Sequence, residues 1–398
     1  MNLIIQKFGG TSVATPNSRL QVIDKITSAI KNGEMPIVVV SAIGRFGAPY
    51  ATDTLLHFVQ DEAGEIPDRE YDMLLSCGEL ISAVTIATLL NNCGIPAKAF
   101  TGGQSGIITD ENHKEAELLY TEPEQLLECI SNNIVPVVAG FQGMTINGQI
   151  TTIGRGGSDT TASMLGASVK ANRIEIYTDV DGIMTADPRV CNKAHIISEI
   201  SYREIFQMAD SGAKVIHPRA VEYAMRANIP LVIKNTFTDA IGTTILQSVA
   251  QPKKGAVTTH LTGIAHRSGR IQYTITDPIL AKVDLLALVA SHHISIDLIN
   301  IFPHYKVFTI DNYNKKKMEK LLEEGNYEYR KIENCAKITA ISEQMTGIPG
   351  VMSRIIKSMT QNGIEVFQTA DSLTTIACLI PEDKISLATC ALHEEFSL

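Results

Sequence analysis

The stretch LIIQKFGGTS, residues 3–12, joins an apolar strand directly to a pair of glycines. Its first half predicts a buried strand over Leu3–Phe8, and a helical pattern begins near Asn17. Adjacent glycines at a strand-to-helix turn let backbone N–H groups approach an anion, and the helix N-terminus adds partial positive charge. With Lys7 beside the glycines, the stretch predicts a phosphate site. The alternative is a tight turn that needs glycine only for a positive φ.

The same alternation of strand-like and helix-like segments continues through the first 235 residues. Apolar β-rich runs predict further strands at Ile37–Ser41, Ala97–Phe100, Ile134–Ala139, Arg173–Thr178 and Leu231–Lys234. Helical spacing of apolar residues predicts helices at 20–30, Met73–Leu90, Thr160–Val169, Tyr202–Met208 and Pro218–Ala227. This order is typical of an α/β domain with a mainly parallel sheet, whose ligands lie beyond the carboxyl ends of the strands.

Composition indicates an ordinary soluble globular protein. The 398 residues suffice for two or three domains, and 44% are hydrophobic and 19% charged. No run approaches the ~18 apolar residues of a membrane span, and the N-terminus lacks signal-peptide features, so we expect a cytoplasmic protein without a membrane partner. The net charge of −9 disfavours a nucleic-acid partner. Seven scattered cysteines without Cys-x-x-Cys spacing favour reduced thiols.

The chain from residue 247 onward has a different pattern. Residues 247–260 lack apolar periodicity and predict a linker. Helix-like Leu280–Ser291 then leads into strand-like Ile294–Ile301, and about 70 residues later Val351–Gln361 leads into Ile364–Thr369. This repetition predicts two βαββαβ modules. The alternative is a single irregular α+β domain.

A second polar cluster, TIGRGGSDTT at 152–161, precedes a predicted helix. Three glycines around Arg155 suit close recognition of a carboxylate or phosphate by a planar cation. For Asp159 the alternative is a purely structural helix cap.

A third cluster, TDVDGIMTADPR at 178–189, follows a predicted strand. Its first two carboxylates suit a metal or a ribose, and turn formation is the alternative. Lys214 lies between two predicted helices, where a solvated surface lysine is the alternative. The sequence contains no Gly-x-x-x-x-Gly-Lys-Ser/Thr, which excludes a P-loop, and no Gly-x-Gly-x-x-Gly follows the first strand.

Taken in order, these motifs resemble the aspartokinase family. The resemblance is carried by KFGGTSV (7–13), Ser41-Ala42, SCGE (76–79), AGFQG (139–143), TIGRGGSDTT (152–161) and TDVDGIMTADPR (178–189). It covers essentially the whole chain, and the tail is similar to the paired ACT domains that sense amino acids. RFGAPYATDTL (45–55), NCAKITAIS and QTADSLTTI are most like the diaminopimelate-sensitive branch found in Gram-positive bacteria.

The resemblance implies an amino-acid-kinase α/β/α sandwich with an open, mainly parallel sheet over residues 1–246. A linker at 247–260 and two ACT domains at 261–334 and 335–398 would follow, with an early strand near 261–266 joining the second. The implied reaction moves the ATP γ-phosphoryl group to the β-carboxylate of L-aspartate. The product, 4-phospho-L-aspartate, leads to diaminopimelate, lysine, threonine and methionine. An end product, meso-diaminopimelate or else lysine or threonine, would inhibit a homodimer paired through the ACT domains.

Specific residues follow from the matched motifs. The catalytic residues would be Lys7, Asp159 and Lys214. The aspartate site would contain Ser41, Thr52, Glu79, Arg155 and Ser158. ATP would contact Lys7, Phe8, Gly9, Gly10, Thr178, Asp179, Met184, Thr185, Ala186, Asp187, Pro188, Arg189 and Lys214. The effector would bind at Asp277, Ser295, Ile296 and Asp297, although the loop after Asp277 lacks the glycine that is common in the family. Mg²⁺ would bridge phosphate oxygens, with no side chain assigned as its ligand.

Two other functions compete with this one. The first is a kinase of the same fold that acts on glutamate, carbamate or a nucleotide; Glu79 together with Arg155 disfavours the last two. The second is a catalytically inactive amino-acid sensor, against which the full set of charged residues argues.

Overall fold

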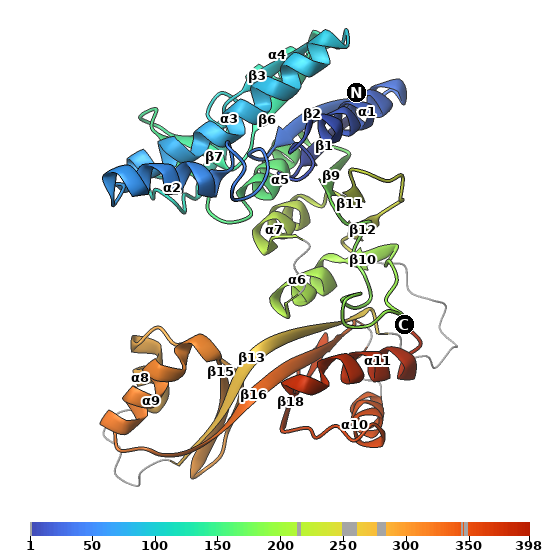
Figure 1. The fold of residues 1–398 in the computed structure, drawn as a ribbon. Helices are drawn as coiled ribbons and strands as arrows, with labels where there is room; N and C mark the ends of the chain where they lie inside the picture. The colour runs from blue at the N-terminus through green and yellow to red at the C-terminus, as the bar shows by residue number, and fades with distance from the viewer. Residues whose placement is uncertain (1, 213–215, 249–260, 277–283, 344, 346–348) are drawn as a thin grey trace. The chain divides into compact units, whose positions relative to one another are not determined.

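The computed structural model describes residues 2–212, 216–248, 261–276, 284–343, 345 and 349–398. These residues form two compact units. Unit 1 comprises the described parts of 1–183, 196–206 and 214–251, and unit 2 comprises those of 184–195, 207–213 and 252–398. Each unit is described by itself (Figure 1).

Unit 1 is built on an eight-stranded sheet of order β10-β12-β11-β9-β1-β2-β6-β3. Its strands are β1 (Leu3–Phe8), β2 (Met35–Val40), β3 (Ala97–Phe100), β6 (Val135–Ala139), β9 (Arg173–Thr178), β10 (Glu199–Ser201), β11 (Leu231–Asn235) and β12 (Thr243–Leu246). Its helices are α1 (Pro16–Lys31), α2 (Thr52–Ala63), α3 (Asp68–Asn92), α4 (Glu124–Ser131), α5 (Gly157–Val169) and α7 (Pro218–Ala227), while α6 (Tyr202–Asp210) has residues in both units. Every pairing in this sheet is parallel except that of β11 with β12.

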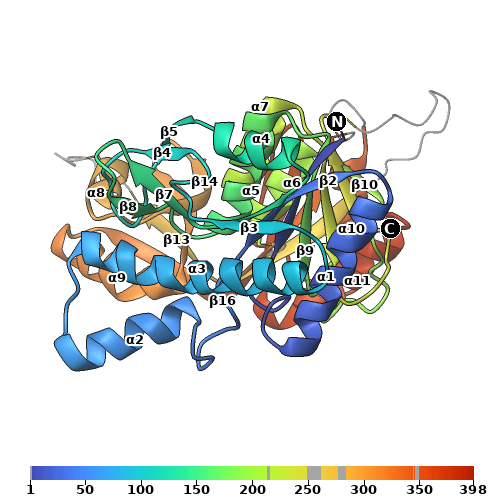
Figure 2. The ribbon, with the colours of Figure 1, turned by 90° about the horizontal axis from the view of Figure 1, so that it is seen from above.

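Helices cover both faces of this sheet. Helices α1 and α3 lie along one face, and α5 and α7 lie on the opposite one (Figure 2). On the first face Phe8, Ile26, Val38 and Ile86 share one apolar core. Because both faces are covered, the central strands are continuous apolar runs, as the sequence suggested. The fold is therefore the α/β sandwich that was predicted.

A smaller sheet of order β5-β4-β7-β8 completes unit 1. It consists of β4 (Ile107–Thr109), β5 (Leu118–Thr121), β7 (Gln142–Thr145) and β8 (Ile150–Thr152). Strand β7 follows β6 after two residues, so this sheet begins where a strand of the large sheet ends.

Unit 2 contains one six-stranded sheet of order β14-β15-β13-β16-β18-β17, in which every pair is antiparallel. Its elements are β13 (Gly263–Thr276), α8 (Leu285–Ser291), β14 (Ile296–Ile301), β15 (Tyr305–Asp311), η1 (Asn312–Asn314), α9 (Lys315–Glu324), β16 (Glu328–Ile341), α10 (Val351–Gln361), β17 (Gln368–Asp371), β18 (Thr375–Pro381), η2 (Glu382–Lys384) and α11 (Ile385–Glu395).

The two long strands β13 and β16 run through both ACT-like halves of unit 2 and lie side by side (Figure 1). Residues Arg270–Thr276 of β13 pair with β15 and with the first part of β16, whereas Gly263–Arg267 pair with Lys337–Ile341. Each half has its own apolar core, one around Phe308 and the other around Ile355. Unit 2 thus has two halves that share β13 and β16, each with its own helices and apolar core. Their division into two βαββαβ modules stays a prediction.

A segment preceding residue 196 also belongs to unit 2. Ala186 and Cys191 are buried in the apolar core of the second module, and the Ile264 N–H donates to the Thr185 carbonyl at 2.7 Å. The Ser386 hydroxyl donates to the Val190 carbonyl at 2.6 Å. Residues 184–195 are therefore built into the C-terminal part of the fold.

Three predicted boundaries in unit 2 are wrong, each for a local reason. The strand expected at Ile364–Thr369 begins only at Gln368, because the Ile364 N–H closes the end of α10 on the Met359 carbonyl. Strand β14 likewise begins at Ile296, because the Ile294 N–H bonds to Val289. Helix α8 begins at Leu285, where Asp284 caps it, and residues 280–283 lie outside the described part.

Candidate active site

The glycine turn after β1 brings a lysine and an aspartate together. Lys7 Nζ lies 2.6 Å from Asp159 Oδ1, and both side chains are largely buried. Neither Gly9 nor Gly10 has a positive φ, so the explanation by turn conformation alone is wrong. A Cβ on Gly10 would lie 2.7 Å from the Gly44 carbonyl oxygen, so close backbone approach is what requires glycine there. The Gly9 N–H donates to the Tyr177 carbonyl at 3.2 Å, and Gly10 lines the neighbouring cavity.

Helix α5 presents its N-terminus to the same place. Its N-cap residue is Gly156, in the left-handed conformation and without a side-chain cap bond. A Cβ on Gly156 would lie 2.3 Å from His217, so only glycine fits. Asp159 is the third residue of the helix and pairs with Lys7, so it has a partner that the cap alternative did not include. The open N-terminus supplies partial positive charge beside the lysine.

Glu79 is a buried carboxylate with an incomplete set of partners. Its Oε1 accepts the Ala42 N–H at 3.1 Å, while Oε2 is buried without a hydrogen-bond partner among the described residues. Burial raises the pKa of Glu79 to about 8, and the Ala42 N–H and the Lys7 ammonium oppose that rise only in part. A buried carboxylate with a free oxygen is suited to receive a cation from a ligand.

One cavity of about 270 Å³ unites these groups. Its lining residues are Lys7, Gly10, Ser41, Ala42, Gly44, Thr52, Glu79, Phe141, Gly154, Arg155, Gly156, Gly157, Ser158 and Asp159. All five residues expected to bind the substrate are among them, with two of the three expected catalytic residues. The third, Lys214, lies outside the described residues. The cavity thus combines a lysine, an arginine, a helix N-terminus and a buried carboxylate, which suits a ligand carrying both signs of charge.

Arg155 lies on a short loop between β8 and α5. Its side chain is exposed and forms no ion pair within the described part of the chain. Two hydrogen bonds hold the loop in place. The Ile153 N–H donates to the Phe141 carbonyl at 3.0 Å, and the Ile153 carbonyl accepts from the Arg219 guanidinium at 2.8 Å. A free guanidinium on a fixed loop is available to bind a carboxylate of a ligand.

The residues expected to contact ATP fall in both units. Thr178 and Asp179 end β9 in unit 1, where Asp179 pairs with the exposed Arg45 at 3.1 Å. The Phe8 side chain is fully buried and stacks on Tyr177, so only its backbone can meet a ligand. The others, Met184, Thr185, Ala186, Asp187, Pro188 and Arg189, belong to unit 2.

The expected effector residues are only partly described. Asp277 lies outside the described residues, and Ser295 is exposed just before β14. Asp297 Oδ2 lies 2.5 Å from Lys337 Nζ and 3.4 Å from Arg270. Burial alone would raise the pKa of Asp297, but these two cations outweigh it and hold the pKa below its ordinary value.

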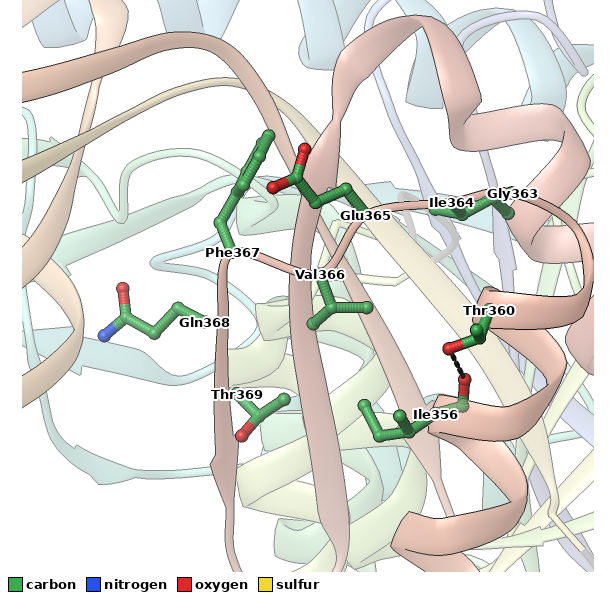
Figure 3. Close-up of a pocket in the computed structure, with 9 residues that line it drawn as sticks. All are labelled: Ile356, Thr360, Gly363, Ile364, Glu365, Val366, Phe367, Gln368 and Thr369. Atoms are coloured by element: carbon green, nitrogen blue, oxygen red, sulfur yellow. Dashed lines mark hydrogen bonds between the residues drawn. The ribbon is translucent and has the colours of Figure 1, made fainter.

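A second cavity, of about 610 Å³, lies in the second module of unit 2. Figure 3 shows Ile356 and Thr360 on α10 facing the extended segment 364–369, with Thr360 bonded to the Ile356 carbonyl at 2.9 Å. Gln368, in its lining, donates to Asn300 Oδ1 at 2.6 Å. The cavity is therefore linked by one side chain to the strand that carries Ile296 and Asp297.

The sequence did not single out several lining residues, chiefly Ala42, Gly44 and Phe141. Two of them stand in the quoted motifs Ser41-Ala42 and AGFQG, which is the signal that could have found them. In the described part of the chain, no three His, Cys, Asp or Glu side chains gather as a metal site. Helix α3 is the one described helix long and apolar enough for a membrane span, and half of its apolar window is buried.

Comparisons with known proteins agree with this geometry. The model of the amino acid kinase family matches residues 2–235, and an ACT domain model matches residues 330–394. Aspartokinase 1 of Bacillus subtilis (strain 168) is 41% identical over 402 residues, and the match covers 100% of both chains.

Solved structures show the same fold. The crystal structure of E. coli aspartokinase III in complex with aspartate and ADP (R-state) matches with a TM-score of 0.78 at 24% identity, covering 100% of both chains. The structure of the same enzyme in complex with lysine and aspartate (T-state) gives the same TM-score, identity and coverage.

Proposed function

Because this chain belongs to the aspartokinase family, we propose that the unit 1 cavity transfers the γ-phosphoryl group of ATP to the β-carboxylate of L-aspartate. The products are 4-phospho-L-aspartate and ADP. The observation that carries this assignment is the shared cavity, which joins an unsatisfied buried carboxylate, a free guanidinium and a buried lysine. Aspartate offers an ammonium and two carboxylates, and each finds an opposite charge among these groups.

Glu79 and Arg155 hold the amino-acid end of the substrate. The ammonium of aspartate meets the free Oε2 of Glu79, and this contact favours the ionised form of that carboxyl group. Arg155 grips the α-carboxylate as a bidentate fork. The hydroxyls of Ser41, Thr52 and Ser158 line the same cavity and orient the β-carboxylate.

Lys7 stabilises the group that moves. Phosphoryl transfer asks chiefly for positioning and for charge stabilisation on the transferred oxygens. Asp159 holds the Lys7 ammonium at 2.6 Å and fixes its direction, and the Gly10 N–H and the N-terminus of α5 add further donors. No general base is needed, because the attacking carboxylate is already ionised near pH 7.

The nucleotide is held by segments assigned through the family motifs. These are the backbone of 8–10, Thr178 and Asp179 at the end of β9, residues 184–189, and Lys214 as a second cation. Mg²⁺ would be held by nucleotide phosphate oxygens and water and not by side chains, since Glu79 Oε1 faces the Ala42 N–H and Asp159 faces Lys7. When bound, the ion neutralises phosphate charge.

Unit 2 is the regulatory part. An amino-acid end product, meso-diaminopimelate first and otherwise lysine or threonine, binds the ACT modules and lowers activity by shifting the population toward a less active state. The modules also pair two subunits as a homodimer, and the enzyme works in the cytoplasm on small molecules.

A coupled ADP-release assay with aspartate and glutamate in parallel tests the proposal. We expect turnover with aspartate and at most a few per cent of that rate with glutamate. Preferred use of glutamate would overturn the substrate assignment. Absence of turnover with either, while an end product still binds, would favour the inactive sensor. Titrating each end product into the same assay identifies the effector.

A further inference from the structure

We propose that Asp72 is a positioning residue for the substrate-binding arginine. Through it, helix α3 sets the distance between Glu79 and the loop that carries Arg155. The inference rests on the proposed function, since it takes Glu79 and Arg155 as the two ends of the aspartate site. Asp72 stands in none of the family motifs quoted above, and it does not line the cavity.

Asp72 is completely buried, yet both oxygens of its carboxylate have hydrogen-bond partners. The Thr152 hydroxyl donates to Oδ1 at 2.5 Å, and the Lys114 N–H lies 3.1 Å from both oxygens. His113 Nδ1 lies 2.8 Å from Oδ2. A buried carboxylate with this many partners fixes the groups around it, because losing any partner leaves a costly unsatisfied atom.

Thr152 transmits that constraint to Arg155. It is the last residue of β8, and only four residues separate it from the start of α5. Gly154 and Gly156 in this connection both have left-handed φ values, so the loop has a defined path. A shift of Thr152 therefore moves the Arg155 backbone, because so short a loop cannot absorb it.

A second contact ties the same strand pair to α3. Gln142 on β7 pairs in register with Thr152 and donates its side-chain N–H to the Ser76 carbonyl at 3.1 Å. Asp72, Ser76 and Glu79 all lie on the buried face of α3. The helix thus contacts the small sheet at two points and lines the cavity through Glu79 at a third.

The spacing of residues on α3 then fixes the distance between Asp72 and Glu79. Asp72 and Glu79 are seven residues apart, which is about two turns or ~10 Å along the axis. One rigid helix therefore places the carboxylate that meets the ammonium and also anchors the loop that meets the α-carboxylate. Loosening the anchor weakens the grip on aspartate and lets the cavity admit the longer glutamate, while the machinery around ATP stays intact.

The matched pair Thr152→Val and Thr152→Ser tests this with little change in volume. Valine removes the hydroxyl that bonds to Asp72, and we expect KM for aspartate to rise about tenfold, with kcat and KM for ATP within twofold of wild type. The aspartate-to-glutamate ratio of kcat/KM should fall. Serine keeps the hydroxyl and should restore aspartate affinity. Calorimetric titration with aspartate alone gives the same comparison without turnover.

Asp72→Asn and Asp68→Ala complete the set. Asp72→Asn keeps the shape and weakens the same bonds, so it should raise KM for aspartate as Thr152→Val does. Among the described residues, the ion-pair partner of Asp68 is the Lys114 side chain at the surface, so Asp68→Ala should leave aspartate affinity unchanged. Thermal unfolding of each variant identifies any that fails to fold. If Asp72→Asn fails, Thr152→Val decides, and if Thr152→Val fails, the comparison of Asp72→Asn with Asp68→Ala decides.

Three outcomes overturn the positioning role. They are unchanged aspartate affinity in Thr152→Val, equal increases in both KM values, and failure of Thr152→Ser to recover. Arg155→Lys separates this from the proposed function. If Arg155→Lys leaves aspartate affinity intact, the substrate assignment itself is wrong. If Arg155→Lys weakens aspartate binding and Thr152→Val does not, only the role of Asp72 is lost.

Discussion

Glu79 in unit 1 is a buried carboxylate and Asp297 in unit 2 is a half-buried one, and their partners differ. Glu79 has one oxygen bonded to the Ala42 N–H and the other without a described partner. Asp297 has the Leu298 N–H on one oxygen at 2.9 Å and the Lys337 ammonium on the other at 2.5 Å. Accordingly the pKa of Glu79 is raised to about 8, while that of Asp297 is lowered.

This difference separates a substrate-binding site, at Glu79, from a structural ion-pair network, at Asp297. Where the chain supplies the counter-charge itself, as at Asp297, the carboxylate is paired within the protein and the network mainly stabilises the sheet. Where the chain leaves a buried carboxylate short of a cation, the missing partner comes from the substrate. Substitutions on the two sides should therefore separate catalysis from stability.

The largest expected effect is on the pocket side, at Lys7. Lys7→Ala removes the ammonium that meets the transferred phosphoryl group, so kcat should fall by about 10³-fold. Steady-state kinetics measures this, with thermal unfolding as the check on folding. Lys25→Ala, which breaks the exposed pair with Asp239, is the matched control and should keep full activity. Unchanged turnover in Lys7→Ala would remove the lysine from the mechanism.

Glu79→Gln should have the next largest effect. The neutral amide cannot balance the substrate ammonium in a buried site, so KM for aspartate should rise about 100-fold. KM for ATP should stay within twofold. A variant that binds aspartate as well as wild type would mean that the free oxygen of Glu79 has another purpose.

The pH dependence of aspartate binding sharpens the comparison further. With a pKa of about 8, Glu79 is mostly protonated at pH 7 in the free enzyme and must ionise to bind the ammonium. Below pH 8, KM should fall about tenfold per pH unit as pH rises. Calorimetry at pH 7 in buffers of different ionisation enthalpy should detect release of close to one proton, and none in Glu79→Gln.

The same shift has a consequence for stability. The folded state keeps the Glu79 proton up to about pH 8, whereas the unfolded chain loses it near 4.5, so the free energy of unfolding falls as pH rises across this window. Ligand-free Glu79→Gln should therefore gain stability relative to wild type at pH 8 and not at pH 4. A flat difference between the two proteins would contradict the raised pKa.

On the scaffold side, Lys337→Met should give the smallest effect. Asp297 keeps Arg270 as a partner and is partly open to solvent, so the loss should be about 1–2 kcal/mol of unfolding free energy. Denaturant unfolding measures it, and kcat without effector should not change. A loss of kcat comparable to that of Lys7→Ala would show that the network in unit 2 belongs to the chemistry.

Much of unit 1 follows from its sequence. The strands Leu3–Phe8 and Arg173–Thr178 were predicted with the bounds that the structure has, because both are rich in β-favouring residues and are buried along most of their length. The polar residues expected around the substrate also lie around one cavity, although Thr52, Glu79 and Ser158 come from helices and not from strand ends. Their individual roles remain predictions.

Other features could not be foreseen from local patterns. Asp72 looks like any acid in the first turns of a helix, and only the fold brings Thr152 and the turn at Lys114 onto it. The partnership of Asp159 with Lys7 joins residues 152 positions apart. Helix α8 begins at Leu285 because Asp284 caps it there. Strand β17 begins later than expected because the Ile364 N–H still bonds to Met359 at the end of α10.

The second module also encloses a piece of chain from far upstream. Ala186 and Cys191 fill its apolar interior, and Thr185 bonds through its hydroxyl to the buried His393 at 2.9 Å. A protein truncated at residue 246 would keep residues 184–195 but lose the module that buries Ala186 and Cys191. These apolar side chains would then be exposed to water. We therefore expect a fragment that ends at residue 246 to aggregate, and co-expression with residues 261–398 should rescue it.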